Sequence, residues 1–334
     1  MSWRGRFVED DPMSRNVLVT GGAGFIGSHI CQRLLDRGDE VMCLDSFGSD
    51  YDPALKRSNI ATLIARAGFD LIEGDIRDKG LLGHIAQTRR IDSVIHLAAR
   101  TGVRASMKSP AEYADVNFHG TAQILEMARD HSIDNFIFAS SSSVYGERTE
   151  TPFKESDPVN HPASPYAATK CSGEILCRSF QQLFGINISC LRYFTVYGPR
   201  QRPGMAIHRF CSLISQGEPV PMYGDGSSER DYTYIDDIVD GTLLALDRCN
   251  GFDIFNLGNH HSIRLDQLIA AIGRSCGVDY SVETEPVQSG DVSRTYACLE
   301  KSHALLGYQP KVALEQGLDR FVEWLTSHDQ KTIC

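Results

Sequence analysis

Apolar residues in this chain occur in short continuous runs separated by longer stretches with helical periodicity. Runs rich in Val, Ile, Leu and Phe are found at 16–20, 40–44, 70–72, 93–97, 135–138 and 186–191. Continuous rather than alternating apolar residues predict strands that are buried on both faces of a sheet. Helical stretches lie between the runs, notably around 112–131 and 166–184. The alternation predicts an α/β fold with a doubly wound parallel sheet.

The pattern changes after residue 192. Segment 198–231 is rich in Pro and Gly, which predicts loops and a small lobe. A helix near 236–247, a strand at 253–256 and helices near 264–275 and 314–328 are expected to follow. The predicted organisation is a flexible leader at 1–14, a main α/β domain at 15–192 that also includes 232–260, and a smaller C-terminal lobe made of 193–231 and 261–330.

Composition and charge narrow the class of protein. Hydrophobic residues make up 42% and charged residues 23%, as in ordinary globular proteins. The formal net charge of -10 argues against a nucleic-acid partner, because neutralising phosphates requires a basic face. Residues 1–15 are too polar for a signal peptide, and no apolar run approaches the ~20 residues of a membrane span. The cysteines include no Cys-x-x-Cys pair, which favours a reducing cytoplasm and no metal site.

A glycine-rich turn, Gly21-Gly22-Ala23-Gly24-Phe25-Ile26-Gly27, follows the first strand and precedes a helix. Glycines permit a tight turn and close backbone approach, and a helix N-terminus favours a pyrophosphate. Asp45 ends the next strand, where a carboxylate can accept hydrogen bonds from both hydroxyls of an adenosine ribose. Because that carboxylate repels a 2′-phosphate, the pattern predicts a Rossmann-type domain that binds NAD rather than NADP. Asp75 is a candidate contact for the adenine amino group, or an ordinary loop carboxylate.

Tyr166 and Lys170 are one helical turn apart in Tyr166-Ala-Ala-Thr-Lys170. A tyrosine that acts as a base near neutral pH needs a pKa about three units below its ordinary value of about 10, which requires about 4 kcal/mol of selective phenolate stabilisation. Lys170 and a positive nicotinamide ring can supply much of this, and Lys170 can also donate to the nicotinamide ribose. A hydroxyl of the serine run Ser140–Ser143, which directly follows a core strand, can complete a proton relay between a substrate alcohol and the phenol. The alternatives are a packed tyrosine beside a solvent-exposed lysine, and a solvated serine turn.

Together these residues resemble the extended short-chain dehydrogenase/reductase family, and specifically its nucleotide-sugar epimerases. The resemblance extends over nearly the whole chain, and its landmarks are Val19–Gly27, His96–Ala99, Ser140–Gly146, Tyr166–Lys170, Leu191–Pro199 and Arg230–Asp237. It implies a tightly bound NAD that oxidises a UDP-sugar at C4, with Tyr166 as the base and Ser141 in the relay. The 4-keto sugar then turns and takes the hydride back on its other face.

The resemblance also implies which residues bind each ligand. Those expected to contact NAD are Gly21, Gly24, Phe25, Ile26, Gly27, Asp45, Asp75, Ile76, Ala98, Ala99 and Lys170. Those expected to contact the UDP-sugar are Arg104, Ser141, Ser142, Tyr166, Thr195, Arg202, Arg230, Gln288 and Asp291.

The residues before Val144-Tyr145-Gly146 separate the subgroups of this family. Dehydratases have Asp-Glu there, and uronate decarboxylases have a Glu. Ser142 and Ser143 occupy these positions here, so the carboxylic acid that either reaction uses is missing. Dehydration and decarboxylation are therefore disfavoured, whereas epimerisation needs no such group.

Segment 192–230 bears on the identity of the sugar, because it contains arginines but no lysine: Arg192, Arg200, Arg202, Arg209 and Arg230. Arginine suits forked recognition of a diphosphate or carboxylate, although scattered surface arginines are the alternative. The run 194–206 is similar to that of UDP-glucuronate 4-epimerases, as are 51–57 and 102–106. Departures from that group are Gly204, Ser289 and Cys298. The predicted reaction is UDP-glucuronate to UDP-galacturonate, with UDP-glucose/UDP-galactose 4-epimerisation as the alternative.

A uronate substrate poses a chemical problem, because oxidation at C4 gives a β-keto acid that can lose carbon dioxide. We hypothesise that Thr195 and Arg202 hold the carboxylate near the ring plane, where the breaking bond overlaps poorly with the carbonyl. A non-catalytic NAD-binding protein on the same fold is the alternative of a different class. By analogy with the family, we expect a C₂ homodimer formed through the helices near 112–131 and 166–184.

Overall fold

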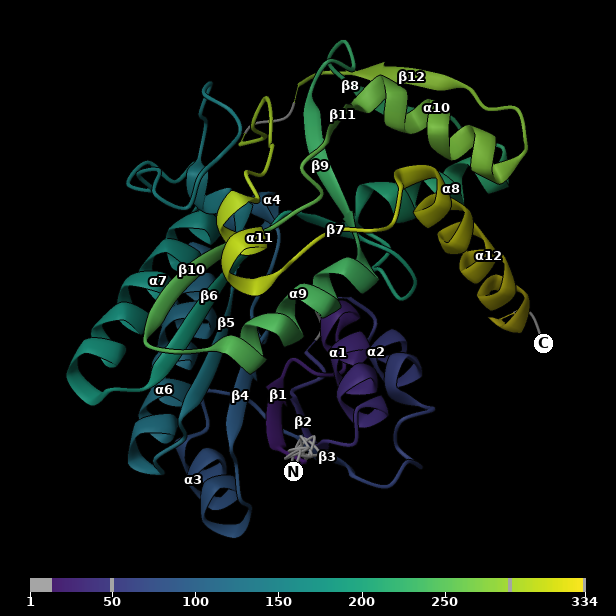
Figure 1. Ribbon diagram of the computed structural model, residues 1–334. Helices are drawn as coiled ribbons and strands as arrows, with labels where there is room; N and C mark the ends of the chain where they lie inside the picture. The colour runs from purple at the N-terminus through teal and green to yellow at the C-terminus, as the bar shows by residue number, and fades with distance from the viewer. Residues whose placement is uncertain (1–13, 49–50, 288–289, 333–334) are drawn as a thin grey trace, which may run out of the picture.

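A seven-stranded sheet forms the centre of the protein (Figure 1). The computed structural model describes residues 14–48, 51–287 and 290–332 of the chain. The strand order is β10-β6-β5-β4-β1-β2-β3, and all neighbouring strands are parallel. The strands are β1 (Asn16–Thr20), β2 (Glu40–Asp45), β3 (Phe69–Glu73), β4 (Ser93–His96), β5 (Asn135–Ser141), β6 (Asn187–Tyr193) and β10 (Phe252–Leu257). The predicted doubly wound parallel sheet is confirmed.

Helices cover both faces of this sheet, because successive strand residues point to opposite sides. Val17 and Val19 belong to the core that contains Leu34 of α1, whereas Leu18 belongs to the core that contains Ile124 of α6. The helices are α1 (Phe25–Asp36) and α9 (Ile235–Arg248) on one face, and α3 (Lys79–Thr88), α6 (Gly120–Asp130) and α7 (Pro165–Phe184) on the other. Within the described residues, no helix has the length and apolar character needed to cross a membrane.

The predicted helix around 112–131 is not continuous. It is divided into α5 (Pro110–Ala114), a π-helical turn at Asp115–His119 and α6. The wider turn places Asn117 in the interior, where its Nδ2 donates to the Thr169 hydroxyl at 3.0 Å and to the Arg100 carbonyl at 3.0 Å. Its Oδ1 accepts from the Arg100 backbone N–H at 2.7 Å. These tertiary hydrogen bonds explain why a π turn interrupts an otherwise regular amphipathic pattern.

A smaller lobe lies beyond the carboxyl ends of the large sheet's strands (Figure 1). One of its sheets has the order β11-β9-β7 and a second pairs β12 with β8. Segment 198–231, predicted as loops and a small lobe, contains a helix and strands. In the helix, Ile207, Phe210, Cys211 and Ile214 are buried with helical spacing, which makes it amphipathic. The elements of the lobe are β7 (Thr195–Tyr197), α8 (Ala206–Gln216), β8 (Val220–Tyr223), β9 (Glu229–Tyr234), β11 (Ser262–Arg264), α10 (Leu265–Cys276), β12 (Val282–Glu285) and α12 (Leu314–Thr332).

The remaining helices are shorter. They are α2 (Pro53–Ile60), α4 (Val103–Lys108) and α11 (Glu300–Leu306), with a 3₁₀ turn at Ser142–Tyr145. The chain leaves the large sheet after β6, builds β7, α8, β8 and β9, and then returns as α9 and β10. The large sheet is therefore completed by a strand from the C-terminal half of the chain.

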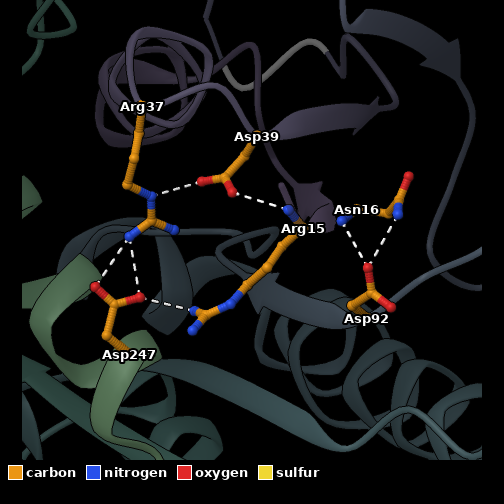
Figure 2. A network of polar contacts seen from close by, with 6 residues as sticks. All are labelled: Arg15, Asn16, Arg37, Asp39, Asp92 and Asp247. Carbon is orange, nitrogen blue, oxygen red and sulfur yellow. Dashed lines mark hydrogen bonds and ion pairs between the residues drawn. The ribbon is translucent and has the colours of Figure 1, made fainter. Parts of the chain in front are cut away.

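At the amino end of β1, a polar network joins the end of α1 to α9 (Figure 2). Asp39 accepts from the Arg15 backbone N–H at 3.0 Å and from Arg37 Nε at 2.6 Å. Asp247 of α9 accepts from Arg15 at 2.7 Å and from Arg37 at 3.0 Å. These contacts fasten the start of the sheet to the last turn of α9, at the end opposite to the carboxyl ends of the strands.

A buried histidine connects the strands with the π turn. His96 Nδ1 lies 2.7 Å from the Thr20 hydroxyl, and His96 Nε2 lies 3.0 Å from the Thr121 hydroxyl. The Thr121 hydroxyl donates to the Asn117 carbonyl, and the Thr20 hydroxyl accepts from the Ala98 N–H at 3.2 Å. This chain of hydrogen bonds fixes the end of β1 relative to the helix that carries Asn117.

His96 should make stability depend on pH. Burial, together with the charge of Lys170, lowers the pKa of His96 from 6.5 to about 3. The folded protein therefore keeps His96 neutral, whereas the unfolded chain protonates it below about pH 6.5. This contribution is complete above about pH 6.5 and falls by up to about 1.4 kcal/mol per pH unit as the pH decreases. In urea unfolding between about pH 7 and 5, we expect the stability of His96→Gln to change less than that of the parent protein.

Other buried groups also titrate, but the parent protein and the His96→Gln variant share them. Burial lowers the pKa of His29 to about 4, which acts in the same direction as His96. Burial raises the pKa of Asp231 to about 6, so its contribution is lost as the pH rises. The difference between variant and parent therefore isolates His96, and an identical pH dependence for the two would contradict the prediction.

Candidate active site

The carboxyl ends of the parallel strands border a cavity of about 650 Å³. It lies where the strand order reverses between β1 and β4, which is where doubly wound sheets bind ligands. Residues of the small lobe line its other side. The sequence-predicted residues that line it are Gly21, Gly24, Phe25, Ile26, Gly27, Asp45, Asp75, Ile76, Ala98, Ala99, Ser141, Ser142, Tyr166, Lys170, Thr195, Arg202, Arg230 and Asp291.

The glycine turn directs the N-terminus of α1 into this cavity. Gly21 has a φ of 70°, which favours glycine, and its carbonyl accepts from the Gly24 N–H at 3.0 Å. A Cβ at Gly27 would lie 2.2 Å from the Gly21 carbonyl oxygen, so the turn and the helix can pack this closely only without a side chain. No side chain caps α1, and its first turn has no acidic residue. The free N–H groups and positive end of the helix therefore suit an anionic diphosphate.

Asp45 is held at the edge of the cavity by its own chain. Its Oδ1 accepts from the Phe47 N–H at 2.8 Å and from Lys56 Nζ at 3.0 Å, and its Oδ2 accepts from the Ala23 N–H at 3.2 Å. The sequence analysis did not include Lys56, whose ammonium orients this carboxylate. The three donors fix the carboxylate, and its remaining acceptor positions suit the hydroxyls of a ribose.

Asp75 already has a strong partner. Its carboxylate accepts from Arg77 Nε at 2.9 Å and from Arg77 Nη2 at 2.6 Å, and this hydrogen bonding lowers the pKa of Asp75. Arg77 also donates to Asp115 of the π turn at 2.5 Å. The neighbouring Ile76 is buried and presents an apolar surface to the cavity.

Helix α7 carries Tyr166 and Lys170 to the carboxyl end of β5. The Ser164 hydroxyl caps the helix by accepting from the Ala167 N–H at 3.1 Å, and Pro165 occupies the first turn. Tyr166 is half-buried in the cavity wall, and Lys170 is buried beneath it. Lys170 Nζ donates to the Ala139 carbonyl of β5 at 2.7 Å.

Ser141 is the last residue of β5 and faces the same space. Its hydroxyl accepts from the Ser143 N–H at 3.2 Å and from the Ser143 hydroxyl at 2.9 Å, which caps the 3₁₀ turn. Tyr166 is supported on its other side by the ring of Tyr113, with 6.4 Å between ring centres in an edge-to-face arrangement. Ser141, Tyr166 and Lys170 thus come together from β5 and α7.

The charges around Tyr166 differ in part from the expectation. Burial raises the pKa of Tyr166, while a hydrogen bond with Ser141 and the positive charge of Arg202 lower it. Burial also lowers the pKa of Lys170 to about 8. At Tyr166 burial outweighs the other two effects, so the pKa is raised overall, where the sequence analysis expected it to be lowered. Arg202 contributes a positive charge that the sequence analysis had assigned only to substrate binding.

The arginines of segment 192–230 separate into different environments. Arg202 lines the cavity and, among the described residues, forms no ion pair. Arg230 also lines it, but its Nη2 donates to Asp291 at 2.6 Å. Arg192 is buried outside the cavity in an ion pair with Glu174, so it fits neither ligand recognition nor the exposed surface arginine that was the alternative for this segment. Its partner is distant in sequence, so a local pattern could not reveal it.

Other predicted residues lie outside the cavity lining. Arg200 donates to Gln32 of α1, and Arg209 donates to the Tyr223 hydroxyl at 3.1 Å. Arg104 is exposed on α4, with its guanidinium 5.4 Å from the centre of the Tyr223 ring. Gly102 and Val103 line the cavity in its place. Gln288 lies outside the described residues.

Asn117 is a site residue that the sequence analysis missed. It joins the loop after β4 to Thr169, whose hydroxyl donates to the Tyr166 carbonyl at 2.7 Å. Helix α7 is thereby tied to the loop that follows β4. An asparagine inside an amphipathic helical pattern was the available signal, because buried amides need partners.

A family model described as "NAD dependent epimerase/dehydratase family" matches residues 17–258 of this chain. A UDP-glucuronate 4-epimerase from Thermodesulfobacterium geofontis is 41% identical over 308 residues, which cover 92% of this chain and 95% of the relative.

Two solved structures have closely similar folds. One is a Bacillus cereus UDP-glucuronic acid 4-epimerase in complex with UDP-glucuronic acid and NAD: it is 38% identical with a TM-score of 0.88, covering 94% of this chain and 99% of that one. The other is a Thermotoga maritima UDP-glucose 4-epimerase with UDP-glucose: it is 34% identical with a TM-score of 0.87, covering 96% and 100% respectively. The chain belongs to the NAD dependent epimerase/dehydratase family.

Proposed function

We propose that this protein is an NAD-dependent 4-epimerase that interconverts UDP-glucuronate and UDP-galacturonate. The observation that carries the proposal is one cavity in which Ser141, Tyr166 and Lys170 lie with Thr195 and Arg202, an arginine that forms no ion pair with any described residue. Ser142 and Ser143 provide no carboxylic acid for dehydration or decarboxylation. Relatives that act on UDP-glucuronate, at about 40% identity over nearly the whole chain, support the choice of sugar.

The residues around the glycine turn fit a bound NAD. The uncapped α1 N-terminus suits the pyrophosphate, and Asp45 suits the adenosine ribose. When bound there, NAD would supply the redox chemistry, as acceptor and then donor of the hydride at C4 of the sugar. In this proposal, residues 15–192 and 232–260 form the NAD-binding domain, while 193–231 and 261–330 form the lobe that binds the UDP-sugar.

Proton transfer is assigned to Tyr166. Its phenolate removes the proton of the C4 hydroxyl when the sugar is oxidised and returns it after the sugar has turned. Ser141 donates a hydrogen bond that stabilises the phenolate, and the charge of Arg202 acts in the same direction. Lys170, fixed by the Ala139 carbonyl, holds a positive charge beneath the reacting groups.

The sugar carboxylate is assigned to Thr195 and Arg202. Arg202 has no ion-pair partner among the described residues, so its guanidinium is available for a forked contact with a carboxylate. Thr195 begins β7, whose pairing with β9 fixes its position beside Tyr232. Holding the carboxylate near the ring plane suppresses loss of carbon dioxide from the β-keto acid.

Replacing Tyr166 by Phe removes the proposed base without changing the size of the ring. We expect kcat to fall by about 10²- to 10⁴-fold, with NAD and UDP-glucuronate still bound. Product formation is followed by separating the UDP-sugars, and bound NAD is measured after denaturation. Tyr308→Phe is the control, because that buried phenol donates to the Gly258 carbonyl away from the cavity. Full turnover by Tyr166→Phe would exclude its role as the base.

Replacing Arg202 by Ala tests the choice of sugar. We expect kcat/KM for UDP-glucuronate to fall by about 10- to 100-fold, and the pentose by-product to rise. Arg209→Ala is the matched control, because this arginine comes from the same segment but lies outside the cavity lining. Unchanged turnover and product ratio in Arg202→Ala, or a parent protein that converts UDP-glucose but not UDP-glucuronate, would favour the neutral-sugar reaction.

We further propose a cytoplasmic homodimer that pairs through α6 and α7. Apolar side chains are exposed on α7, with Ile175 69% and Leu183 70% accessible, and the apolar face suits a partner. Light scattering with size exclusion should give twice the chain mass for the parent protein and the chain mass for Ile175→Glu. Leu305→Glu, on α11, is the control and should remain dimeric. A monomeric parent protein would contradict the proposal.

The nine described cysteines are all free, which fits the reducing environment of the cytoplasm.

A further inference from the structure

An ion pair is buried directly behind the proposed catalytic residues. Glu174 and Arg192 are 4% and 2% exposed. Arg192 Nε donates to Glu174 Oε1 at 2.9 Å, and Arg192 Nη2 donates to Glu174 Oε2 at 2.8 Å. This two-point contact between a planar guanidinium and a carboxylate restricts both the distance and the angle between the two side chains.

The same carboxylate meets all the elements that carry the proposed catalytic groups. Glu174 lies on α7, one turn beyond Lys170 and two turns beyond Tyr166. The Ser140 hydroxyl of β5 donates to Glu174 Oε1 at 2.5 Å, and Ser140 is the residue before Ser141. Glu174 therefore connects α7 to β5 beside the relay serine, and to β6 through the ion pair.

The pairing of β5 with β6 extends this connection across the sheet. Ser140 is the neighbour of Arg192 across β5 and β6, and Ser141 is the neighbour of Tyr193. Two residues after Tyr193 the chain reaches Thr195, the proposed carboxylate contact. A change in the position of the ion pair would therefore move the relay serine relative to the phenol on α7.

Two further contacts hold the guanidinium of Arg192. It lies 4.8 Å from the centre of the Tyr145 ring, and its Nη1 donates to the Glu155 carbonyl at 3.3 Å. The Tyr145 hydroxyl donates to Asn256 Oδ1 of β10 at 2.6 Å. The ion pair is thus part of a network that reaches the edge strand of the sheet.

Packing alone does not specify this arrangement. Helix α7 approaches β5 at Gly173, where an added Cβ would lie 2.4 Å from Cζ of Phe138. This contact sets how closely the helix approaches the sheet, but the hydrophobic effect is non-directional and does not orient polar side chains. A buried ion pair gives little net stability compared with apolar residues of similar volume, but it can specify one register.

Glu174 also acts on Lys170 through its charge. Burial lowers the pKa of Lys170, whereas Glu174 and Cys177 on the same helix raise it. His96 of β4 faces the same lysine, and the Lys170 charge helps to keep that imidazole neutral. A negative charge one turn away therefore helps the buried lysine to remain an ammonium.

We propose that Glu174 and Arg192 are positioning residues, which hold Ser141, Tyr166 and Lys170 in their reactive arrangement from behind the cavity. The inference rests on the proposed epimerase function, since it assigns these side chains a part in that reaction. Neither residue lines the cavity, so both act through the residues that they hold.

The decisive variant is the double replacement Glu174→Leu/Arg192→Met, which removes the ion pair without leaving an unpaired buried charge. Glu174→Gln is a second variant that keeps an acceptor for Ser140 but removes the charge. The control is Arg37→Met/Asp39→Leu, which removes a partly buried pair at the opposite end of the sheet (Figure 2). Each protein is prepared with bound NAD, and its melting temperature is recorded.

Two readouts separate positioning from stability. In UDP-glucuronate turnover, we expect a kcat about 10- to 100-fold lower in the double variant, with KM unchanged within about threefold. The titration of Tyr166 is followed by tyrosinate absorbance, and each protein is corrected with the same protein carrying Tyr166→Phe. In the double variant, Tyr166 should titrate at a pH at least about half a unit higher than in the parent protein. The control should match the parent protein in both readouts, whatever its melting temperature.

The outcomes distinguish this inference from the proposed function. A folded variant with parental kcat and an unchanged Tyr166 titration would overturn the positioning role. If the double variant does not fold, the same two readouts on Glu174→Gln decide the question. If the parent protein does not convert UDP-glucuronate, the proposed function fails, while the tyrosinate titration, which needs no sugar, still tests the positioning.

Discussion

The arrangement of the site depends on the close contact between helix α1 and the turn that precedes it. With a Cβ at Gly27 only 2.2 Å from the Gly21 carbonyl oxygen, any side chain would push the helix away from β1. The contact directs the first turn of α1 toward the switch point of the sheet. Because all seven strands are parallel, the carboxyl ends of the other strands lie at the same edge of the sheet. Asp45, Ala98, Ser141 and Tyr193 are therefore delivered to one cavity by different strands or the loops after them.

Around this cavity, the protein combines burial with a small number of directed polar contacts. Burial alone disfavours the charged forms of Tyr166 and Lys170. Ser141, Arg202 and Glu174 act in the opposite direction, each from a different element. At Tyr166 burial outweighs the other groups and the pKa is raised, so the protein's own groups hold the phenol in its neutral form.

Much of this could be predicted from the sequence, for identifiable reasons. The large sheet was predictable because strands buried on both faces are continuously apolar, and the family resemblance is confirmed by the family model and the relatives. Strand β5 continues to Ser141, beyond its apolar part, because its polar end is paired with β6. The π turn depends on partners of Asn117 that are distant in sequence, so a local pattern could not reveal it. The same is true of the burial of Arg192, which depends on its ion pair with a residue of α7.

The path of the chain through the large sheet has a consequence for biosynthesis. Strand β10 completes the edge beside β6, but it is made only after β7, α8, β8 and β9. Until residue 257 has left the ribosome, β6 presents unpaired backbone groups along an apolar edge, which is a template for association with other chains. Nascent chains and fragments that end before β10 therefore expose an aggregation-prone strand edge, which β10 covers in the complete sheet.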